Sequence, residues 1–220
     1  MIEEKDENSI SIKVTLVGSS GVGKTCIAER YTQNEFVENN NSTSGANYLK
    51  KEINIKDKKI MLDIWDTAGQ EKFHSLGRHF YKNSNIIIIV YDITNKESFE
   101  DIKNYWYKDI MENGEKYKVI GIVGNKIDLY DNDAYKEFDD SIVKDFLNSI
   151  NDKKETKIIN MKVSAKTGVN IKSLFEKLIE EYLKKEFNSF IKQESLKKGH
   201  SFKVEEIEKK ENEKLCCSKN

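Results

Sequence analysis

The segment that most constrains the fold of this chain is Gly18–Thr25, whose residues read GSSGVGKT. It follows an apolar, strand-like run, Ile12–Val17, and precedes a stretch that can continue as a helix. Glycines let the backbone curl until several N–H groups converge, and a helix N-terminus adds positive partial charge. The spacing of glycine, four residues, then Gly-Lys-Thr is that of a phosphate-binding P-loop. The sequence therefore predicts a strand–loop–helix unit that binds phosphate groups.

Strand-like and helix-like segments alternate along the chain, which favours an α/β fold with a mostly parallel sheet. The link Lys56–Lys59 is short and polar, so its two flanking strands should form a hairpin with one strand antiparallel. Helices should begin at Gly23, near Lys96 with Thr94 or Asn95 as cap, around Asp140 and near Ile171. Strands are expected at Ile12–Val17, Lys51–Ile55, Ile60–Trp65, Asn85–Tyr91, Val119–Gly124 and Ile158–Val163. We expect a six-stranded, mostly parallel sheet with one antiparallel strand and helices on both faces.

The size and composition fit one folded domain with a tail. The chain has 220 residues, 37% of them hydrophobic, and its 37 Lys and Arg nearly balance 38 Asp and Glu. The net charge of −1 gives no reason to expect a nucleic-acid partner. The first residues are charged and lack an apolar core, so no secretory signal is expected. We expect a short N-terminal segment (1–10), a folded domain (11–186) and a variable tail (187–220).

Two further segments lie after predicted strands and suit a purine base. Asn125–Asp128, reading NKID, follows the fifth strand, and Ser164–Lys166, reading SAK, follows the sixth. The Asp128 carboxylate can accept from two guanine N–H groups, a donor pair that adenine lacks. The Ala165 N–H could donate to the guanine O6. These residues favour GTP, although the P-loop by itself leaves an ATPase open.

The segment Asp66–Glu71, reading DTAGQE, follows the third predicted strand. Asp66 suits an outer partner of Mg²⁺, and the Thr25 hydroxyl should ligate the ion. Gly69 can offer its N–H to a γ-phosphate without a Cβ in the way. Gln70 is placed to orient an attacking water.

Together, these motifs resemble the Ras superfamily of small GTPases and, within it, the Rab family. The resemblance covers roughly Ser11 to Leu183 and implies a P-loop GTPase domain. Its Rab-like segments are Trp65–Phe73, Ser75–Gly77, Tyr91–Thr94 and the tail Cys216–Asn220. Three stretches, Tyr48–Lys51, Phe73–Leu76 and Ile122–Asp128, resemble the endocytic branch.

The resemblance implies roles for further residues. Phe36 matches the aromatic that packs on guanine, and Thr43 matches the threonine that ligates Mg²⁺ beside the γ-phosphate. Tyr48, Trp65 and Phe80 match an aromatic triad that displays the nucleotide state to effectors, and simple packing of the hairpin is the alternative. Ser44 and Asn47 differ from the residues that Rabs usually carry on this effector face. Gly45 belongs to the same face.

The candidate residues fall into groups by role. For catalysis they are Gln70, Lys24, Gly69 and Thr43; for Mg²⁺ they are Thr25, Thr43 and Asp66. For nucleotide binding they are Ser20, Gly21, Val22, Gly23, Lys24, Thr25, Cys26, Phe36, Asn125, Lys126, Asp128, Ser164, Ala165 and Lys166. Cys26 is expected to be a small buried residue rather than a reactive thiol.

Hydrolysis should be slow, because no arginine lies where the family places one in cis: Arg30 is in the first helix and Arg78 in the second switch region. The resemblance implies an exchange factor, an activating protein, effectors, an escort protein and a dissociation inhibitor as partners of a monomer. A nucleotide-holding scaffold without turnover is the alternative class.

The tail carries adjacent cysteines, Cys216 and Cys217, which resemble the Rab signal for two prenyl groups. Two lipid chains give stable membrane attachment where one is marginal. A Cys-a-a-X box fits less well because Ser218 and Lys219 are not aliphatic, and unmodified cysteines are a further alternative. We expect the cytoplasmic face of an intracellular membrane, with an endosomal membrane as the finer hypothesis.

Overall fold

The computed structural model describes residues 10–38, 43, 45–55, 58–69, 79–113, 119–130, 140–150 and 156–197. The chain divides into two compact units, Met1–Tyr182 and Leu183–Asn220. The first unit contains the sheet and every strand described below. The domain boundaries expected at residues 10 and 186 stay a prediction.

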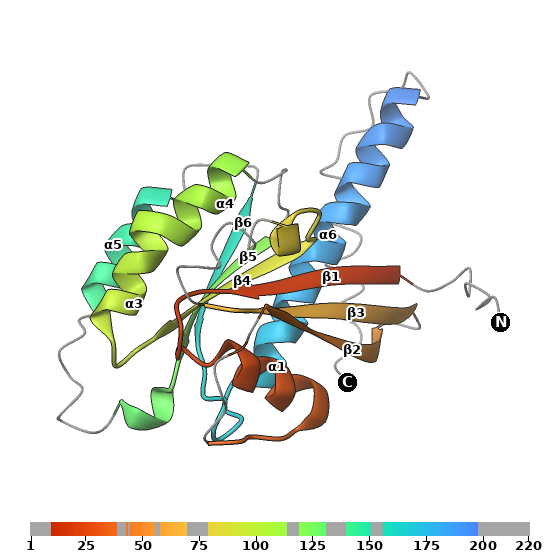
Figure 1. The fold of residues 1–220 in the computed structure, drawn as a ribbon. Coiled ribbons are helices and arrows are strands. Elements are labelled where there is room, and N and C mark those ends of the chain that lie inside the picture. Colours follow the sequence, from red (N-terminus) through yellow and green to blue (C-terminus); the bar gives the residue numbers. More distant parts are fainter. Residues whose placement is uncertain are drawn as a thin grey trace, which may run out of the picture. The chain divides into compact units, whose positions relative to one another are not determined.

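One six-stranded sheet runs through the first unit in the order β2-β3-β1-β4-β5-β6 (Figure 1). All neighbouring strands are parallel except β2, which pairs antiparallel to β3. This arrangement confirms the predicted α/β fold, the hairpin and the one antiparallel strand. The strands are β1 (Ile10–Val17), β2 (Ala46–Ile55), β3 (Lys58–Thr67), β4 (Ile86–Asp92), β5 (Val119–Asn125) and β6 (Lys157–Lys162).

Helices cover both faces of the sheet, with α1 and α6 on one side and α3, α4 and α5 on the other (Figure 1). Their starts confirm the predictions, and Asn95 is the cap of α3, accepting from the Ser98 N–H. A π-helical turn, Ile102–Trp106, joins α3 to α4. The helices are α1 (Lys24–Gln33), α3 (Lys96–Asp101), α4 (Tyr107–Asn113), the 3-10 turn η3 (Ile127–Leu129), α5 (Asp140–Ile150) and α6 (Ile171–Lys197).

The core is built around β4, whose seven residues are all buried. On the α3 side, Ile87, Ile89 and Tyr91 pack with Phe99 and Trp106 in one cluster. A strand buried on both faces needs apolar residues at successive positions, which the run of isoleucines supplies. On the other side α6 buries a stripe of apolar residues at helical spacing: Ile171, Leu174, Phe175, Leu178, Ile179 and Tyr182.

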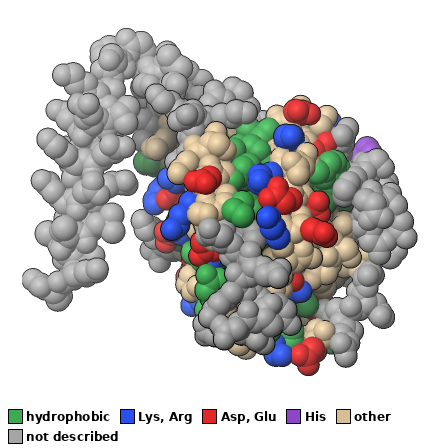
Figure 2. Space-filling view, turned by 90° about the vertical axis from the view of Figure 1, so that its left-hand side faces the viewer, with side chains coloured by type: hydrophobic (Ala, Val, Ile, Leu, Met, Phe, Trp, Pro, Cys, Tyr) green, Lys and Arg blue, Asp and Glu red, His purple; other side chains and the backbone are tan. Residues whose placement is uncertain are grey.

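Most strand bounds differ from the prediction by one or two residues, and two elements extend further than expected. Strand β2 begins at Ala46 rather than at Lys51, because Ala46 already pairs with Thr67 of β3. Helix α6 continues to Lys197, past the point near Glu186 where the apolar pattern decays. Figure 2 shows the side that carries α3, α4 and α5, where acidic and basic side chains mix around small hydrophobic patches. Among the described residues, no helix is both long and apolar enough to cross a membrane.

Candidate nucleotide-binding site

A cavity of about 480 Å³ opens at the carboxyl ends of the parallel strands β1 and β5. Ligands of open α/β sheets bind at this edge of the strands. Most of the predicted nucleotide-binding residues meet here, although they come from segments far apart in the sequence. The cavity is lined by Ser20, Gly21, Gly23, Lys24, Thr25, Cys26, Phe36, Glu38, Thr43, Gly69, Asn125, Lys126, Asp128, Leu129, Ala165 and Lys166.

The phosphate loop joins β1 to α1 and depends on glycine at Gly23. Its φ of +93° is one that L side chains rarely adopt, and an added Cβ would overlap the Asn125 side-chain amide. The Gly23 carbonyl accepts from the Ile27 N–H at 3.0 Å, which begins the first turn of α1. The N-terminus of this ten-residue helix therefore borders the cavity and favours an anion there.

Lys24 is the buried cation of the cavity, with 5% of its surface exposed. Its Nζ donates to the carbonyls of Gly18 at 2.8 Å and Ser19 at 2.9 Å. Burial lowers the pKa of Lys24 to about 8, and the charge of Asp66 opposes this shift. Gly69 lies against the same group, because an added Cβ there would overlap the Lys24 Nζ and the Ser19 carbonyl.

The three predicted Mg²⁺ residues form one cluster of oxygen atoms. The Thr25 hydroxyl donates to Asp66 Oδ2 at 2.6 Å and lies 2.9 Å from the Thr43 hydroxyl. Asp66 is fully buried, and its Oδ1 has no hydrogen-bond partner in the part of the chain that the structure describes. Burial raises the pKa of Asp66 to about 6, a shift that the Thr25 bond and the Lys24 charge oppose. Mg²⁺ prefers oxygen ligands, and the unpaired Oδ1 fits a cation nearby.

This cluster differs from a metal site made by protein ligands alone. Within the described ranges, no group of three or more His, Cys, Asp or Glu side chains is placed to hold a metal. Mg²⁺ commonly takes one or two carboxylates and completes its shell with water and substrate phosphates. The two hydroxyls and the Asp66 carboxylate are therefore a sufficient protein contribution.

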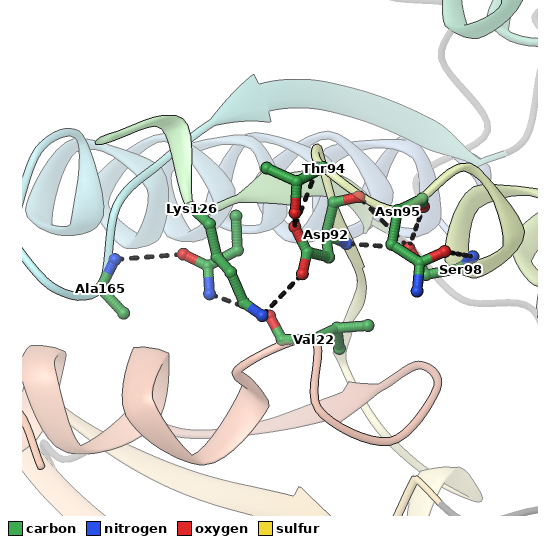
Figure 3. A network of polar contacts seen from close by, with 8 residues as sticks. Val22, Asp92, Thr94, Asn95, Ser98, Lys126 and Ala165 are labelled. Atoms are coloured by element: carbon green, nitrogen blue, oxygen red, sulfur yellow. Dashed lines mark hydrogen bonds and ion pairs between the residues drawn. The ribbon is translucent and has the colours of Figure 1, made fainter. Parts of the chain in front are cut away.

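On the other side of the cavity, Asn125 connects its own segment to the phosphate loop and to the segment Ser164–Lys166 through Val22 and Ala165, which Figure 3 labels. Its Nδ2 donates to the Val22 carbonyl at 2.9 Å, and its Oδ1 accepts from the Ala165 N–H at 3.1 Å. The Ser164 hydroxyl donates to Asp128 Oδ1. Asn125 thus orients the loop, as expected, whereas the bond from the Ala165 N–H to guanine stays a prediction.

Lys126 and Lys166, both predicted to bind nucleotide, line the cavity, and each has an acidic partner. Lys126 Nζ lies 2.6 Å from Asp92 Oδ2, and Lys166 Nζ lies 2.7 Å from Glu38 Oε1. The second pair is exposed; it lowers the pKa of Glu38 and raises the pKa of Lys166. Asp92 does not line the cavity, so its contact draws the Lys126 ammonium away from it, whereas Glu38, the partner of Lys166, is itself a lining residue.

The three residues of the predicted aromatic triad lie together and do not line the cavity. The ring centroids of Tyr48 and Trp65 are 5.1 Å apart, and those of Trp65 and Phe80 are 5.9 Å apart. Tyr48 is 42% exposed, so the triad reaches the surface. The Gly45 carbonyl accepts from the Ala68 N–H at 2.7 Å, which joins the two segments that precede and follow the hairpin.

Several predicted residues are elsewhere. Val22 and Ser164 contact residues of the site without lining the cavity. Cys26 is half-buried at the cavity wall rather than buried, because α1 turns its first residues toward the opening. Four predicted residues lie outside the described residues: Ser44, Gln70, Cys216 and Cys217.

Four residues that the structure ties to the site had no predicted role in it: Glu38 and Leu129 line the cavity, whereas Asp92 and Arg30 contact residues that line it. Asp92 ends β4 at the same sheet edge, a position that could have drawn attention to it. Arg30 donates from Nε to the Ala165 carbonyl and from Nη2 to the Lys166 carbonyl, both at 2.9 Å. No local pattern indicates this role of Arg30, because its partners are far away in the sequence.

Comparisons with known proteins agree with this geometry. A sequence model of the Ras family matches residues 13–184. The chain is 33% identical to the Ypt/Rab-type GTPase ypt71 of Schizosaccharomyces pombe, over 77% of this chain and 80% of that protein. It is 35% identical to the human Ras-related protein Rab-22A, over 74% of this chain and 79% of that protein. The GTP-binding protein YPTC5 of Chlamydomonas reinhardtii is 49% identical over 34% of this chain, a match that spans 36% of the algal protein.

Proposed function

The chain belongs to the Ras family as a Rab-type small GTPase, and from this premise we propose that it is a nucleotide switch in membrane trafficking. In this proposal it binds GTP or GDP with Mg²⁺, hydrolyses GTP slowly, and changes shape between the two states. The observation that supports it best is a cavity that combines the buried Lys24, the Thr25 and Thr43 hydroxyls and residues of the Asn125–Asp128 loop.

The phosphates bind at the loop and at Lys24 in this proposal. The Lys24 Nζ, which two loop carbonyls already orient, donates to the β- and γ-phosphates. With a pKa of about 8, Lys24 is mostly protonated at neutral pH, and phosphate charge favours that form further. The N–H groups around Gly21 and Gly23 and the start of α1 add fixed positive partial charge.

Mg²⁺ would be held by Thr25 and Thr43, with the ionised Asp66 carboxylate beside them. The bound ion would supply positive charge that balances the phosphate oxygens. Asp66 accepts from the Thr25 hydroxyl, which turns the lone pairs of that oxygen toward the ion. The buried position of Asp66 keeps water from competing for the same contacts.

Hydrolysis proceeds by in-line attack of water on the γ-phosphorus. The new bond joins the water oxygen to phosphorus, and the bond to the β–γ bridging oxygen breaks, which leaves GDP and phosphate. Gln70 orients the water, and the Gly69 N–H binds a γ-phosphate oxygen. The guanidinium of Arg30 donates to the Ala165 and Lys166 carbonyls on the base side and to the Asn34 carbonyl after α1, so it is not placed to supply charge to the γ-phosphate. The rate without an activating protein is on the order of 10⁻⁴ to 10⁻² s⁻¹.

The signal is the loosening of two segments after hydrolysis. Loss of the γ-phosphate removes contacts of Thr43 and Gly69, so Glu38–Tyr48 and Gly69–Asn83 lose their anchors. The Tyr48–Trp65–Phe80 triad lies beside both segments and presents the state to effectors. Because Ser44 and Asn47 differ from the usual Rab residues, the surface that effectors would contact differs chemically from that of other Rabs.

A single-turnover GTP assay with Gln70→Leu tests the catalytic proposal. With an activating protein present, the variant should retain GTP while the wild type converts it to GDP. Gln33→Leu, the same change at an exposed position at the end of α1, is the matched control and should behave as wild type. Unchanged turnover in Gln70→Leu would remove the water-orienting role, and no turnover in the wild type would favour a scaffold that only holds nucleotide.

Competition between GTP and ATP tests the base-reading role of Asp128. The wild type should prefer GTP by about 100-fold or more, since a bound adenine would cover the Asp128 carboxylate without donating to it. Asp128→Asn should lose most of that preference, whereas Asp145→Asn, an exposed change on α5, should not. Equal binding of GTP and ATP by the wild type would instead favour an ATPase.

Membrane attachment through prenyl groups on Cys216 and Cys217 completes the proposal, with an exchange factor, an activating protein, an escort protein and a dissociation inhibitor as partners. The endocytic branch is the finer hypothesis, supported by the resemblance of Tyr48–Lys51 and Ile122–Asp128. A tagged chain should lie on endosomal membranes, and the double Cys→Ser variant should be dispersed, with Ser218→Ala as the control. Intact mass spectrometry showing no added mass at either cysteine would contradict the lipid attachment.

A further inference from the structure

Asp92 is a buried carboxylate at the end of β4, beside the base-reading loop but not in the wall of the cavity. It pairs in register with Asn125 across β4 and β5 and is 7% exposed. Its two oxygens have separate partners (Figure 3). Oδ2 contacts Lys126 Nζ at 2.6 Å, whereas Oδ1 accepts from the Thr94 N–H at 2.9 Å and the Thr94 hydroxyl at 2.7 Å.

Lys126 needs such a partner because its backbone is in an unfavourable conformation. Its φ of 70° and ψ of 35° place it in the left-handed region, which is unfavourable for a residue other than glycine. On either side the chain is fixed: Asn125 is buried, and the Ile127 N–H donates to the Val163 carbonyl at 3.1 Å. The side chain of Lys126 is 34% exposed, so its direction is not set by burial alone.

We propose that Asp92 is a positioning residue of the guanine site, which acts through Lys126 and sets how long the nucleotide stays bound. The carboxylate draws the ammonium to one side, so that the aliphatic stem of Lys126 lies along the cavity wall where the base would stack. It also holds the left-handed turn that aims the following Asp128. The inference rests on the proposed function, since it assigns a residue to the same guanine site.

The two oxygens of Asp92 allow this role to be separated from a structural one. Oδ1, together with the Asp92 carbonyl that accepts from the Asn95 N–H at 3.0 Å, builds the turn before α3. Of the two oxygens, only Oδ2 contacts a residue that lines the nucleotide cavity, namely Lys126. Asp92→Asn keeps an acceptor for Thr94 and sets an NH₂ group against the ammonium, whereas Thr94→Val removes the hydroxyl bond and leaves the Lys126 contact in place.

The test is a double-mutant cycle on the full-length chain, read out as the dissociation rate of a fluorescent GDP analogue in excess unlabelled GDP. Asp92→Asn should release the analogue about tenfold faster, the scale of losing one charge-assisted contact. Lys126→Met, which keeps the aliphatic stem, should also accelerate release. The double variant should be no faster than Lys126→Met, because both changes remove one interaction. Thr94→Val, the matched control, should stay within about twofold of wild type, since its change is local to the turn.

A wild-type rate for Asp92→Asn, or effects that multiply in the double variant, would overturn the inference. If Asp92→Asn does not fold, Lys126→Arg and Lys126→Met decide, because arginine retains a cation that can pair with Asp92 and methionine does not. Equal release rates for these two variants would also overturn it. Failure of the proposed function is seen separately, in a wild-type protein that retains no GDP at all.

Discussion

Two cavities of about 480 Å³ each lie at the two ends of α1, and their equal size makes their different chemistry instructive. The first, described above, includes Lys24 and Thr25 at the start of the helix. The second includes Arg30, Tyr31 and Asn34 at its end, with Lys51 of β2 and Lys172 of α6 beside them. Both contain cations, so neither volume nor charge alone tells which of them binds phosphate.

The direction of the helix distinguishes the two. At the start of α1, N–H groups point into the cavity, and Lys24 adds a positive charge in the same place. At its end, carbonyl oxygens are exposed, and cations are taken up by them: Lys51 Nζ donates to the Tyr31 carbonyl, and Arg30 Nη1 donates to the Asn34 carbonyl at 2.8 Å. Lys51 Nζ also lies 4.3 Å from the centroid of the Tyr31 ring. The helix dipole favours anions at one end and cations at the other, so the second set of cations stabilises the fold.

Lys24→Met should produce the largest effect. Removing the only buried cation that the structure describes in the first cavity should weaken GTP binding by about 100-fold or more, since truncating one member of a buried charged contact costs roughly 2–5 kcal/mol. Equilibrium titration with a fluorescent GTP analogue measures this change. An affinity within a few-fold of wild type would mean that the loop N–H groups suffice to bind phosphate. The Lys24 ammonium would then not be what distinguishes the first cavity from the second.

Lowering the pH should weaken Mg²⁺ binding next. Because the folded-state pKa of Asp66 is raised to about 6 and the ion needs the ionised carboxylate, Mg²⁺ affinity of the GDP-bound protein should fall by up to about tenfold per pH unit below 6. Mg²⁺ titrations from pH 5 to 8 test this. Protonation of the nucleotide phosphates also lowers Mg²⁺ affinity at low pH, and the Asp66→Asn variant measures this contribution alone. Parallel pH profiles for wild type and Asp66→Asn would therefore refute the role of Asp66.

The raised pKa of Asp66 also affects the stability of the metal-free protein. Here the effect is opposite in sign: stability rises as the pH is lowered. Between about pH 4 and 6 the folded protein holds a proton on Asp66 that the unfolded chain has lost, so the free energy of unfolding falls as pH rises through this window. Chemical denaturation of the metal-free protein at several pH values measures the slope. Asp66→Asn should flatten it.

Arg30→Met should produce a smaller effect, because Arg30 belongs to the second cavity yet supports the first. Its two bonds to the Ala165 and Lys166 carbonyls hold the SAK loop, so their loss should speed GDP dissociation by roughly three- to tenfold, at about 1 kcal/mol of net contribution. Arg30→Lys keeps the charge without the planar fork and should lie in between. Dissociation rates equal to wild type would show that the loop holds its shape without this side chain.

Lys51→Met should produce the smallest change in nucleotide binding, within about twofold of wild type, while it removes about 0.5–1 kcal/mol of stability with the contact to the Tyr31 ring. GDP affinity and thermal unfolding of the same preparation measure both effects. A loss of GTP affinity comparable to that of Lys24→Met would contradict the distinction between the two helix ends.

The site could largely be predicted because its motifs are runs of consecutive residues placed after strands. Gly18–Thr25, Asn125–Asp128 and Ser164–Lys166 each carry their own chemistry, and the parallel sheet brings the carboxyl ends of their strands together. The fold followed from the same alternation of strands and helices. These inferences need only local patterns and the topology that such patterns dictate.

What could not be predicted depends on contacts between distant segments. The start of β2 at Ala46 depends on pairing with Thr67, since residues such as Asn47 and Lys50 give no strand pattern on their own. The π-helical turn at Ile102–Trp106 leaves no trace in the spacing of apolar residues. The partnership of Asp92 with Lys126 becomes apparent only when the ends of β4 and β5 lie side by side.

The arrangement of the site across the sheet also has a consequence for the stability of the folded protein. Phosphate-side groups come from residues up to Gly69, and base-side groups other than Phe36 come from Asn125 onward, so one bound nucleotide would bridge the early and late halves of the chain. A ligand that binds only the folded state raises stability with the logarithm of its free concentration over its dissociation constant. The stability of this fold therefore depends on the concentration of guanine nucleotide. The nucleotide-free protein would lose the link between its two halves before any strand separates.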